Sequence, residues 1–484
     1  MAERKIYQVS GYPEEVIAVA FARTSRVAGT IQDSLNVLTE KKAGEFHEKW
    51  VVGYGHASVA EHAVVHLALE GVSRLATESI ESSRLASYTE KSTRFQKITP
   101  DQTLTPKSVI NSPWRNDWDQ AHSQLFAAYD LALDKVGAEV KKAFPARDGE
   151  TSEKHDVRVR TKYTDICRFG LPLSVLANLG LTANARVLEA VCSQLLSSPL
   201  KEVREIGEEM KREAMKVAPT LIKYAAENLY LRDTPPAMRA IVGQILAQGE
   251  IVLPEGTHPE VELVDYDPQA EQNFIAGWLY RFGNGAGFTD CLRIAGEMSL
   301  DQKRELIKQA LSRMGRYDKV GREAELLRLT YDVNIDNGGF GDFKRNRMMT
   351  QIHQEFTGVC GLAIPRIIDN VGAGEQMRAA IRFAADLAQV LKGDLSENEY
   401  KYLFTNATMR RMLLAMNMRE LFDFWRTRSA PNTNPSYRYA ALVMGDLAKR
   451  AYPLIWEYTN MIEKESPVSS QDVLDAFYLE GKLI

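Results

Sequence analysis

Two matching stretches decide the fold: KIYQVSGYPEEVIAVAFARTSR (residues 5–26) near the N-terminus, and VELVDYDPQAEQNFIAGWLYR (residues 261–281) in the second half. In the first, a short alternating segment meets Pro13, and an apolar pattern with helical spacing begins at about Glu14. In the second, an alternating segment meets Pro268 and again leads into a helix. Strand, proline and amphipathic helix thus recur in the same order, which predicts a chain built by duplication.

The length of the chain agrees with two units. With 484 residues, it is too long for one ordinary core. In RDTPPAMRA (residues 232–240), Pro235 and Pro236 follow a long helical pattern. Prolines interrupt helical hydrogen bonding, so we expect the connection there, with repeats at residues 1–235 and 236–484.

Composition indicates a soluble, folded protein. Hydrophobic residues make up 45% and charged residues 26%, with a formal charge of -4. This balance gives no general reason to expect binding to nucleic acid or to a membrane, although a small anion pocket is compatible with it. The four cysteines are widely spaced and no stretch approaches the roughly 20 apolar residues of a membrane span. We expect a cytoplasmic protein.

Helical patterns outnumber strand patterns, which indicates an α+β fold. Two local patterns invite other interpretations. His62 and His66, four residues apart, suggest zinc, but the order of residues is not that of a zinc helix and no third ligand is evident, so no metal is expected. FGNGAGF (residues 282–288) resembles a phosphate loop, but it follows a helical pattern, so a plain loop is the better interpretation.

The segment ESSRLASYTEKSTRF (residues 81–95) is the strongest candidate for a functional site. Its charged residues are spaced too unevenly for one helix face, which favours a loop. In a loop, hydroxyl and backbone N–H groups approach an anion closely, and arginine offers a bidentate fork to phosphate. A charged surface turn is the alternative from composition alone.

GHASVAEH (residues 55–62) followed by this segment resembles the signature of the flavin-dependent thymidylate synthases, Arg-His-Arg-x-x-Ser-x-Asn-Glu-x-Ser-x-Arg. The matching positions are Arg84, Ser87, Glu90, Ser92 and Arg94, whereas Ser82, Ser83 and Thr89 replace Arg, His and Asn. Further on, CRFGLPLSVLANLGLTANARVLEA (residues 167–190) resembles a later block of the same family.

The second half resembles the family more faintly and keeps other residues. Arg345, Asn346 and Arg347 resemble the Arg-His-Arg triplet, while His353, Glu355 and Thr357 stand at the later Glu, Ser and Arg. In LLAMNMRELFDFWRTRSAPN (residues 413–432), the Asn-x-Arg pair is present, and Arg428 stands where the family has the arginine that polarises uracil. Each half keeps what the other has lost.

This resemblance implies two repeats of an antiparallel sheet with long helices, and a reaction that methylates dUMP to dTMP. FAD would be the cofactor, with methylenetetrahydrofolate and NADPH as co-substrates. Because family members are homotetramers with sites between subunits, a fused chain would form a homodimer that rebuilds a pseudo-tetramer.

The resemblance also implies residue roles. Arg428 would be catalytic, and substrate would be bound by Glu90, Lys91, Ser92, Thr93, Arg94, Arg168 and Arg345. FAD would be bound by His56, Ser58, Arg84, Glu90, Asn184, Arg186, Arg345, Asn346, Arg347, Asn417 and Arg419. Each has an ordinary alternative: Asn184 as a helix cap, Arg186 paired with Glu189, Arg419 paired with Asp423.

The replaced signature residues leave two other functions open. A degenerate paralogue would bind flavin or a pyrimidine nucleotide without making thymidylate, because Ser82 and Ser83 remove charge that the family places against its ligands. An enzyme would otherwise transfer a one-carbon unit to another pyrimidine nucleotide.

Overall fold

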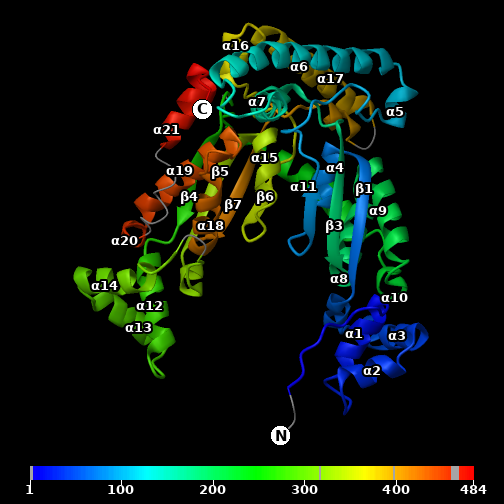
Figure 1. The fold of residues 1–484 in the computed structure, drawn as a ribbon, viewed down its shortest axis with the longest axis vertical. Coiled ribbons are helices and arrows are strands. Elements are labelled where there is room, and N and C mark those ends of the chain that lie inside the picture. Colours follow the sequence, from blue (N-terminus) through cyan, green and yellow to red (C-terminus); the bar gives the residue numbers. More distant parts are fainter. Residues whose placement is uncertain (1–3, 255, 316–317, 396–397, 459–467, 484) are drawn as a thin grey trace.

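The computed structural model describes residues 4–254, 256–315, 318–395, 398–458 and 468–483. Long helices surround two antiparallel sheets (Figure 1). The first half contains α1 (Glu14–Arg23), α2 (Ile31–Val37), α3 (Glu40–Phe46), η1 (His47–Gly53), η2 (Ala57–His62), β1 (Val64–Ser73), α4 (Arg74–Ile80), β2 (Ser87–Glu90), α5 (Lys107–Ile110), α6 (Arg115–Ala143), α7 (Ser152–Cys167), η3 (Arg168–Gly170), β3 (Leu176–Asn184), α8 (Ala185–Leu196), α9 (Lys201–Ala214), α10 (Pro219–Ile222) and α11 (Leu229–Leu246).

The second half repeats much of this order, and the predicted α+β fold of two repeats is confirmed. Its elements are β4 (Glu260–Tyr266), α12 (Ala270–Phe282), α13 (Phe288–Glu297), α14 (Leu300–Leu311), η4 (Arg322–Leu326), β5 (Arg328–Asp336), α15 (Asn337–Phe343), β6 (Thr350–His353), α16 (Arg366–Asn370), α17 (Gly374–Asp394), η5 (Glu399–Leu403), β7 (Met409–Asn417), α18 (Met418–Arg428), α19 (Pro435–Ala451), α20 (Pro453–Trp456), α21 (Ser470–Leu474) and η7 (Asp475–Glu480).

The two sheets have the same register. The first has the order β1-β3-β2, and the second has the order β4-β5-β7-β6. In the first, Ser73 lies opposite Leu176, the first residue of β3; in the second, Asp336 lies opposite Met409, the first residue of β7. Ser73 and Asp336 then cap the seven-residue helices α4 and α15 with their side chains. Their positions in the two repeats are therefore equivalent.

A pseudo-two-fold axis relates the repeats, because several residues contact their own equivalents. Pro172 and Thr405, each four residues before its central strand, form an antiparallel bridge. The Nζ of Lys344 lies 2.8 Å from Oε2 of Glu81, its equivalent in the first repeat. Self-contacts of this kind are what an isologous interface between two copies produces.

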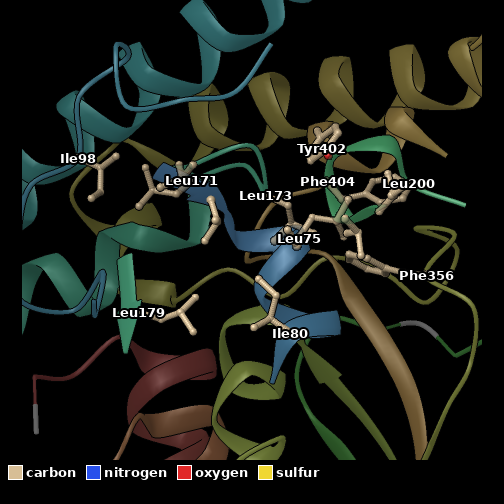
Figure 2. Packing of buried hydrophobic residues seen from close by; sticks show 14 of the residues in the cluster. Leu75, Ile80, Ile98, Leu171, Leu173, Leu179, Leu200, Phe356, Tyr402 and Phe404 are labelled. Atoms are coloured by element: carbon tan, nitrogen blue, oxygen red, sulfur yellow. The ribbon is translucent and has the colours of Figure 1, made fainter. Parts of the chain in front are cut away.

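A hydrophobic core at the junction contains side chains of both repeats, and a further cluster lies within the second repeat. Leu173 donates its N–H to the carbonyl of Phe404 at 2.8 Å, and Asn406 donates to the carbonyl of Leu171 at 3.1 Å. Figure 2 shows the side chains of Leu171 and Leu173 in one cluster with Phe404, although the repeats are far apart in sequence. The long helices α6 and α17 cover this junction, and the sheets extend from it as two arms (Figure 1). Burying each such side chain contributes about 1.5–3 kcal/mol.

Two local predictions were wrong. Pro235 and Pro236 lie inside α11, which continues through the expected connection. None of the described residues of α11 is buried, so water can satisfy the carbonyls that lose a partner. The segment before Pro13 forms no strand, whereas its counterpart forms β4 on the edge of β5. Residues 4–10 lack a neighbouring strand in the described chain, so their pattern alone does not produce one.

Other sequence predictions have a clear outcome. The helix expected from about Glu14 is α1, and residues 283–287 connect α12 to α13 as a plain loop. The boundary at 235/236 stays a prediction. Among the described residues, no helix combines the length and the apolar character that crossing a bilayer requires.

Candidate active site between the repeats

The loop after β2 carries the main candidate residues. Strand β2 pairs with β3, and Glu90 ends it opposite Leu179. The chain then turns at Ser92, whose hydroxyl accepts the N–H of Arg94 at 3.2 Å. Lys91 is held by its backbone N–H, which donates to the carbonyl of Asn178 at 2.8 Å. The result is a short loop, residues 91–95, that faces the second repeat.

A cavity of about 320 Å³ lies between this loop and α15 of the second repeat. Its lining from the first repeat is Arg74, Glu90, Ser92, Thr93, Arg94, Phe95 and Arg168, and from the second repeat Gly338, Gly341, Asp342 and Arg345. Four arginines thus face two carboxylates, which favours an anionic ligand.

Glu90 is the buried acid at the centre of this site, with 2% of its side chain exposed. Arg74 donates to its Oε1 at 2.6 Å, and Lys344 Nζ lies 3.6 Å from its Oε2. Burial favours the neutral acid, but the charges of Arg74, Lys344 and Arg345 outweigh burial, so the pKa of Glu90 is lowered. Glu90 is therefore an ionised carboxylate that fixes basic groups of both repeats.

Arg94 is positioned by Asp165 and by the second repeat. Its Nη2 lies 2.8 Å from Oδ2 of Asp165 and donates to the carbonyl of Asn432 at 3.1 Å. Arg168, almost fully buried, lies 2.9 Å from the other oxygen of Asp165. Among the described residues, the buried Nε of Arg94 and Oγ1 of Thr93 have no hydrogen-bond partner. Both remain available to a ligand.

A second cavity, of about 350 Å³, adjoins the first, because Glu90 and Arg345 line both. Its remaining lining is Glu81, Ala86, Ser87, Tyr88, Thr89, Lys344 and Arg347. Burial, and then the charge of Glu81, raises the pKa of Tyr88 to about 12, so this phenol is neutral. The two cavities form one basic region at the junction of the repeats.

The positions of the signature triplet in the two repeats, residues 82–84 and 345–347, meet at this region. Arg347 Nη1 donates to the carbonyl of Arg84 at 3.4 Å and also to that of Ala86. Arg84 Nη2 donates to Oγ1 of Thr350 at 3.4 Å. Asn346 instead turns into the second repeat, where its amide donates to the hydroxyl of Tyr437. The structure thus places Arg345 and Arg347 in the cavity beside Glu90, and Arg84 contacts Arg347.

Arg428 lies near this region but outside the two cavities. It ends α18, and its guanidinium carbon lies 5.5 Å from the ring centroid of Tyr437. Asn432, four residues later, accepts from Arg94. Arg428 is absent from the described residues that line either cavity. Its buried Nε has no hydrogen-bond partner within the described part of the chain.

The remaining candidates lie at the far ends of the central strands. Asn184 caps α8 by accepting the N–H of Val187 at 2.9 Å, and Asn417 caps α18 by accepting from Glu420 at 3.0 Å. Asn184 ends β3, whereas Leu176, at the opposite end, begins it. Neither asparagine is among the described residues that line the two cavities, and Asn184 lies five residues beyond Leu179, the residue opposite Glu90.

Arg186 and Arg419 are held by acids from other elements. Arg186 pairs with Glu61, and Arg419 pairs with Glu325 at 2.9 Å. Glu189 and Asp423, the neighbours that helix spacing suggested, are not the partners that the structure shows for them. Long-range pairs replace the local ones, because α8 and α18 pack against η2 and η4.

His56 and Ser58 line a third cavity, of about 250 Å³, on the outer end of the first arm. Its walls include the rings of Phe21, Phe46 and Trp50. Such walls suit a planar ring. His62, on η2, and His66, on β1, do not share a helix, and no group of three potential metal ligands occurs among the described residues.

Comparison with known proteins decides the family. The sequence matches the family described as thymidylate synthase complementing protein over residues 7–220 and again over residues 262–454. The chain belongs to this family. It carries the family's fold twice in tandem, with a partly degenerate signature.

Some relatives match most of this chain, and others match about half of it. A UPF0159 protein of Chlamydia muridarum is 27% identical over 87% of this chain and 82% of its own length. A flavin-dependent thymidylate synthase of Clostridium tetani is 26% identical over 48% of this chain and 89% of its own. A solved UMP/dUMP methylase of Streptomyces cacaoi aligns with a TM-score of 0.35 and 16% identity, over 45% of this chain and all of that one.

The family signature did not reveal Arg74, Lys344 or Asp165. Arg74 and Lys344 neutralise Glu90, and Asp165 holds Arg94. One signal was present for Arg74: Ser73 ends an apolar strand pattern in the way a helix cap does, which places the next residue at a strand-to-helix corner. Lys344 precedes the second triplet directly, but its partners become evident only when the repeats are folded together.

Proposed function

We propose that the chain is a flavin-dependent thymidylate synthase-like enzyme that methylates dUMP to dTMP. One observation carries the proposal: the loop from Glu90 to Arg94 in one repeat and Arg345 in the other line a single basic cavity. The family match over both repeats and the flavin-dependent thymidylate synthases among the relatives support this assignment. The co-substrates would be methylenetetrahydrofolate and NADPH.

The cavity suits the 5′-phosphate of a pyrimidine nucleotide. Ser92 and Thr93 offer hydroxyl groups, and Arg94 offers a guanidinium whose Nε is not used by the protein. The Arg345 side chain is half exposed, and its Nη1 lies 3.5 Å from Oδ1 of Asp342, a loose contact that leaves it able to turn toward a ligand. Arg168 and Lys91 complete the proposed substrate-binding set.

Arg428 is the proposed catalytic group. An arginine can stabilise the negative charge that develops on an activated uracil ring, and its planar fork suits this role better than lysine. The free Nε of Arg428 and its position next to the segment that contacts Arg94 support the proposal.

The residues proposed for FAD form two groups that fit its two parts. Arg345 and Arg347 line the basic region and would hold its phosphates together with Arg84, which contacts Arg347. Asn346, also proposed for FAD, donates to Tyr437 instead. The aromatic cavity beside His56 and Ser58 suits a planar ring. FAD, when bound, supplies hydride transfer. Asn184, Arg186, Asn417 and Arg419 lie at the ends of the arms. Because one chain keeps these groups apart, we propose that a homodimer, a pseudo-tetramer of repeats, brings them together.

Tritium release tests the proposal. Purified protein is mixed with dUMP tritiated at carbon 5, methylenetetrahydrofolate, NADPH and FAD, and released tritium is counted. We expect release that requires all four compounds, together with a bound-flavin absorption spectrum. We also expect Arg428→Ala to lose most of the rate. Full release by Arg428→Ala would remove that assignment, and no release by the wild-type chain would contradict thymidylate synthesis.

A nucleotide-binding paralogue is the second candidate, and the charges of the site favour it. Asp165 already pairs with Arg94 and Arg168, while Arg74 and Lys344 already neutralise Glu90. With Ser82 and Ser83 in place of charged residues, less net charge remains for ligands. A colourless protein that binds dUMP but no FAD would support this candidate. One-carbon transfer to another pyrimidine nucleotide would appear as tritium release from that nucleotide instead.

A further inference from the structure

The pseudo-two-fold axis creates a second position equivalent to the cavity at Arg94. In the first repeat the cavity is built by the loop after β2 and by Arg168, with α15 opposite. Its counterpart is built by the loop after β6 and by Lys401, with α4 opposite. The strand register fixes this equivalence. Glu90 ends the edge strand β2 opposite Leu179, and His353 ends the edge strand β6 opposite Met412. Leu179 and Met412 each lie three residues after the first residue of their strands, β3 and β7.

At this second position, two large charged side chains replace two small residues. Glu78 is the fifth residue of α4, and Gly341 is the fifth residue of α15. Arg410 is the second residue of β7, and Ala177 is the second residue of β3. Gly341 lines the open site, and both charged residues belong to the second position.

The two charged residues bind each other. Nη1 of Arg410 lies 3.0 Å from each oxygen of Glu78 and 3.0 Å from Oδ1 of Asn337. The guanidinium carbon of Arg410 also lies 3.6 Å from the ring centroid of Phe340. Only 7% of the Arg410 side chain is exposed. The Glu78–Arg410 pair therefore occupies the second position, where the open site has only a glycine, Gly341, at the place of Glu78.

The loop after β6, at this second position, has a carboxylate side chain of its own. Glu355 stands where the first repeat has Ser92, and its carboxylate lies 2.7 Å from Arg239 and 3.4 Å from Lys401. Lys401 stands where the first repeat has Arg168. Thr357 stands where the first repeat has Arg94, so the arginine that contacts a ligand is missing. Every basic group named here already has a carboxylate of this chain.

We infer that the side chains of Glu78, Arg410 and Glu355 close this second position, so that each chain has one nucleotide site, at Arg94. This inference rests on the proposed function for the identity of the nucleotide. A phosphate entering the second position would meet two fixed carboxylates and would have to separate a buried ion pair. A dimer of chains would then carry two sites in place of the four that four unfused repeats would form.

Binding stoichiometry tests the inference. Titration calorimetry of the full chain with dUMP should give one dUMP per chain. Arg94→Ala should weaken binding on the order of 10- to 100-fold, because it removes charge-assisted hydrogen bonds. The matched control is Thr357→Ala, at the equivalent position of the second repeat, which should bind like the wild-type chain. Two dUMP per chain would overturn the inference and leave the proposed function standing. Full-affinity binding by Arg94→Ala would overturn both the inference and the assignment of Arg94 to the nucleotide phosphate.

A crystal soaked in inorganic phosphate separates the inference from the identity of the nucleotide. Phosphate beside Arg94, with the Glu78–Arg410 pair intact, supports the inference. Phosphate beside Lys401 overturns it. A chain that binds no dUMP would contradict the proposed function, and the position of phosphate would then decide the inference by itself. Gly341→Glu, which copies Glu78 into the open site, should weaken phosphate and dUMP binding alike. The first carbon of the new side chain fits, because a Cβ at Gly341 would meet only the Arg74 side chain within 4 Å, at 3.7 Å.

Discussion

At the scale of single residues, Lys344 holds the basic region together. Its side chain is 8% exposed, and it pairs with two buried carboxylates, Glu81 and Glu90. Arg74 remains beside Glu90 if Lys344 is lost, but the structure shows no second basic partner for Glu81 among the described residues. The pair between Lys344 and Glu81 joins equivalent positions of the repeats, so it also stabilises their interface.

We therefore expect Lys344→Met to lower the free energy of unfolding by about 3–5 kcal/mol, since it leaves a buried charge unpaired. Urea denaturation measures this change. The double variant Lys344→Met/Glu81→Gln should recover most of the loss, because it leaves no uncompensated charge. A cost for the single variant below about 1 kcal/mol, the range of surface pairs, would contradict the structural role.

His122 gives the stability a pH dependence. It is buried, with Nε2 2.8 Å from Oγ of Ser174 and Nδ1 3.0 Å from the carbonyl of Trp118. Burial lowers the pKa of His122, although Trp118 opposes part of this shift. The unfolded chain then takes up a proton at higher pH than the folded chain does. The contribution of the neutral His122 to the free energy of unfolding is therefore complete above about pH 6.5, and it is lost as the pH decreases below that value.

Urea titrations at pH 7 and pH 5.5 measure this effect. The wild-type chain should lose stability over this interval, and His122→Gln should lose less. An equal loss in both proteins would assign the pH dependence to other groups.

At the scale of elements, the caps of α8 and α18 separate structural from ligand-binding roles. Asn184 and Asn417 cap their helices, and the proposed function assigns both a flavin contact as well. Asn184→Ala should lower the free energy of unfolding by about 1 kcal/mol, while Asn184→Ser should keep the cap and the stability. If Asn184 also contacts FAD, then both variants should bind FAD more weakly in a fluorescence titration. Unchanged FAD affinity in both would leave Asn184 as a cap only.

Elements and sites whose own residues form a clear periodic pattern or motif could be predicted from the sequence. Apolar spacing predicted α1 and the β4–α12 pair, and the signature predicted that Glu90, Arg94 and Arg345 belong to one site. Partners across the fold could not be predicted: Glu61 for Arg186 and Glu325 for Arg419 come from distant elements. The helix through Pro235 and Pro236 could not be predicted either, because it is the exposure of α11 that permits prolines inside it.

At the scale of the whole molecule, the shared core means that the repeats depend on each other. Leu171 and Leu173 of the first repeat pack with Phe404 of the second (Figure 2). Residues 1–254 and 255–484, each expressed alone, should therefore be aggregated or molten, whereas co-expression should yield a soluble complex. Gel filtration and near-ultraviolet circular dichroism measure this outcome. Two halves that fold separately with native signals would contradict a shared core.

If the two repeats build one nucleotide site together, then dUMP binding depends on Arg345 as well as on the loop at Arg94. Equilibrium dUMP binding is measured for the wild-type chain, for Arg345→Ala and for Arg293→Ala, an exposed arginine of the same repeat outside the site. We predict that Arg345→Ala weakens binding on the order of 10- to 100-fold, and that Arg293→Ala has no effect. Wild-type affinity in Arg345→Ala would contradict a site shared between the repeats.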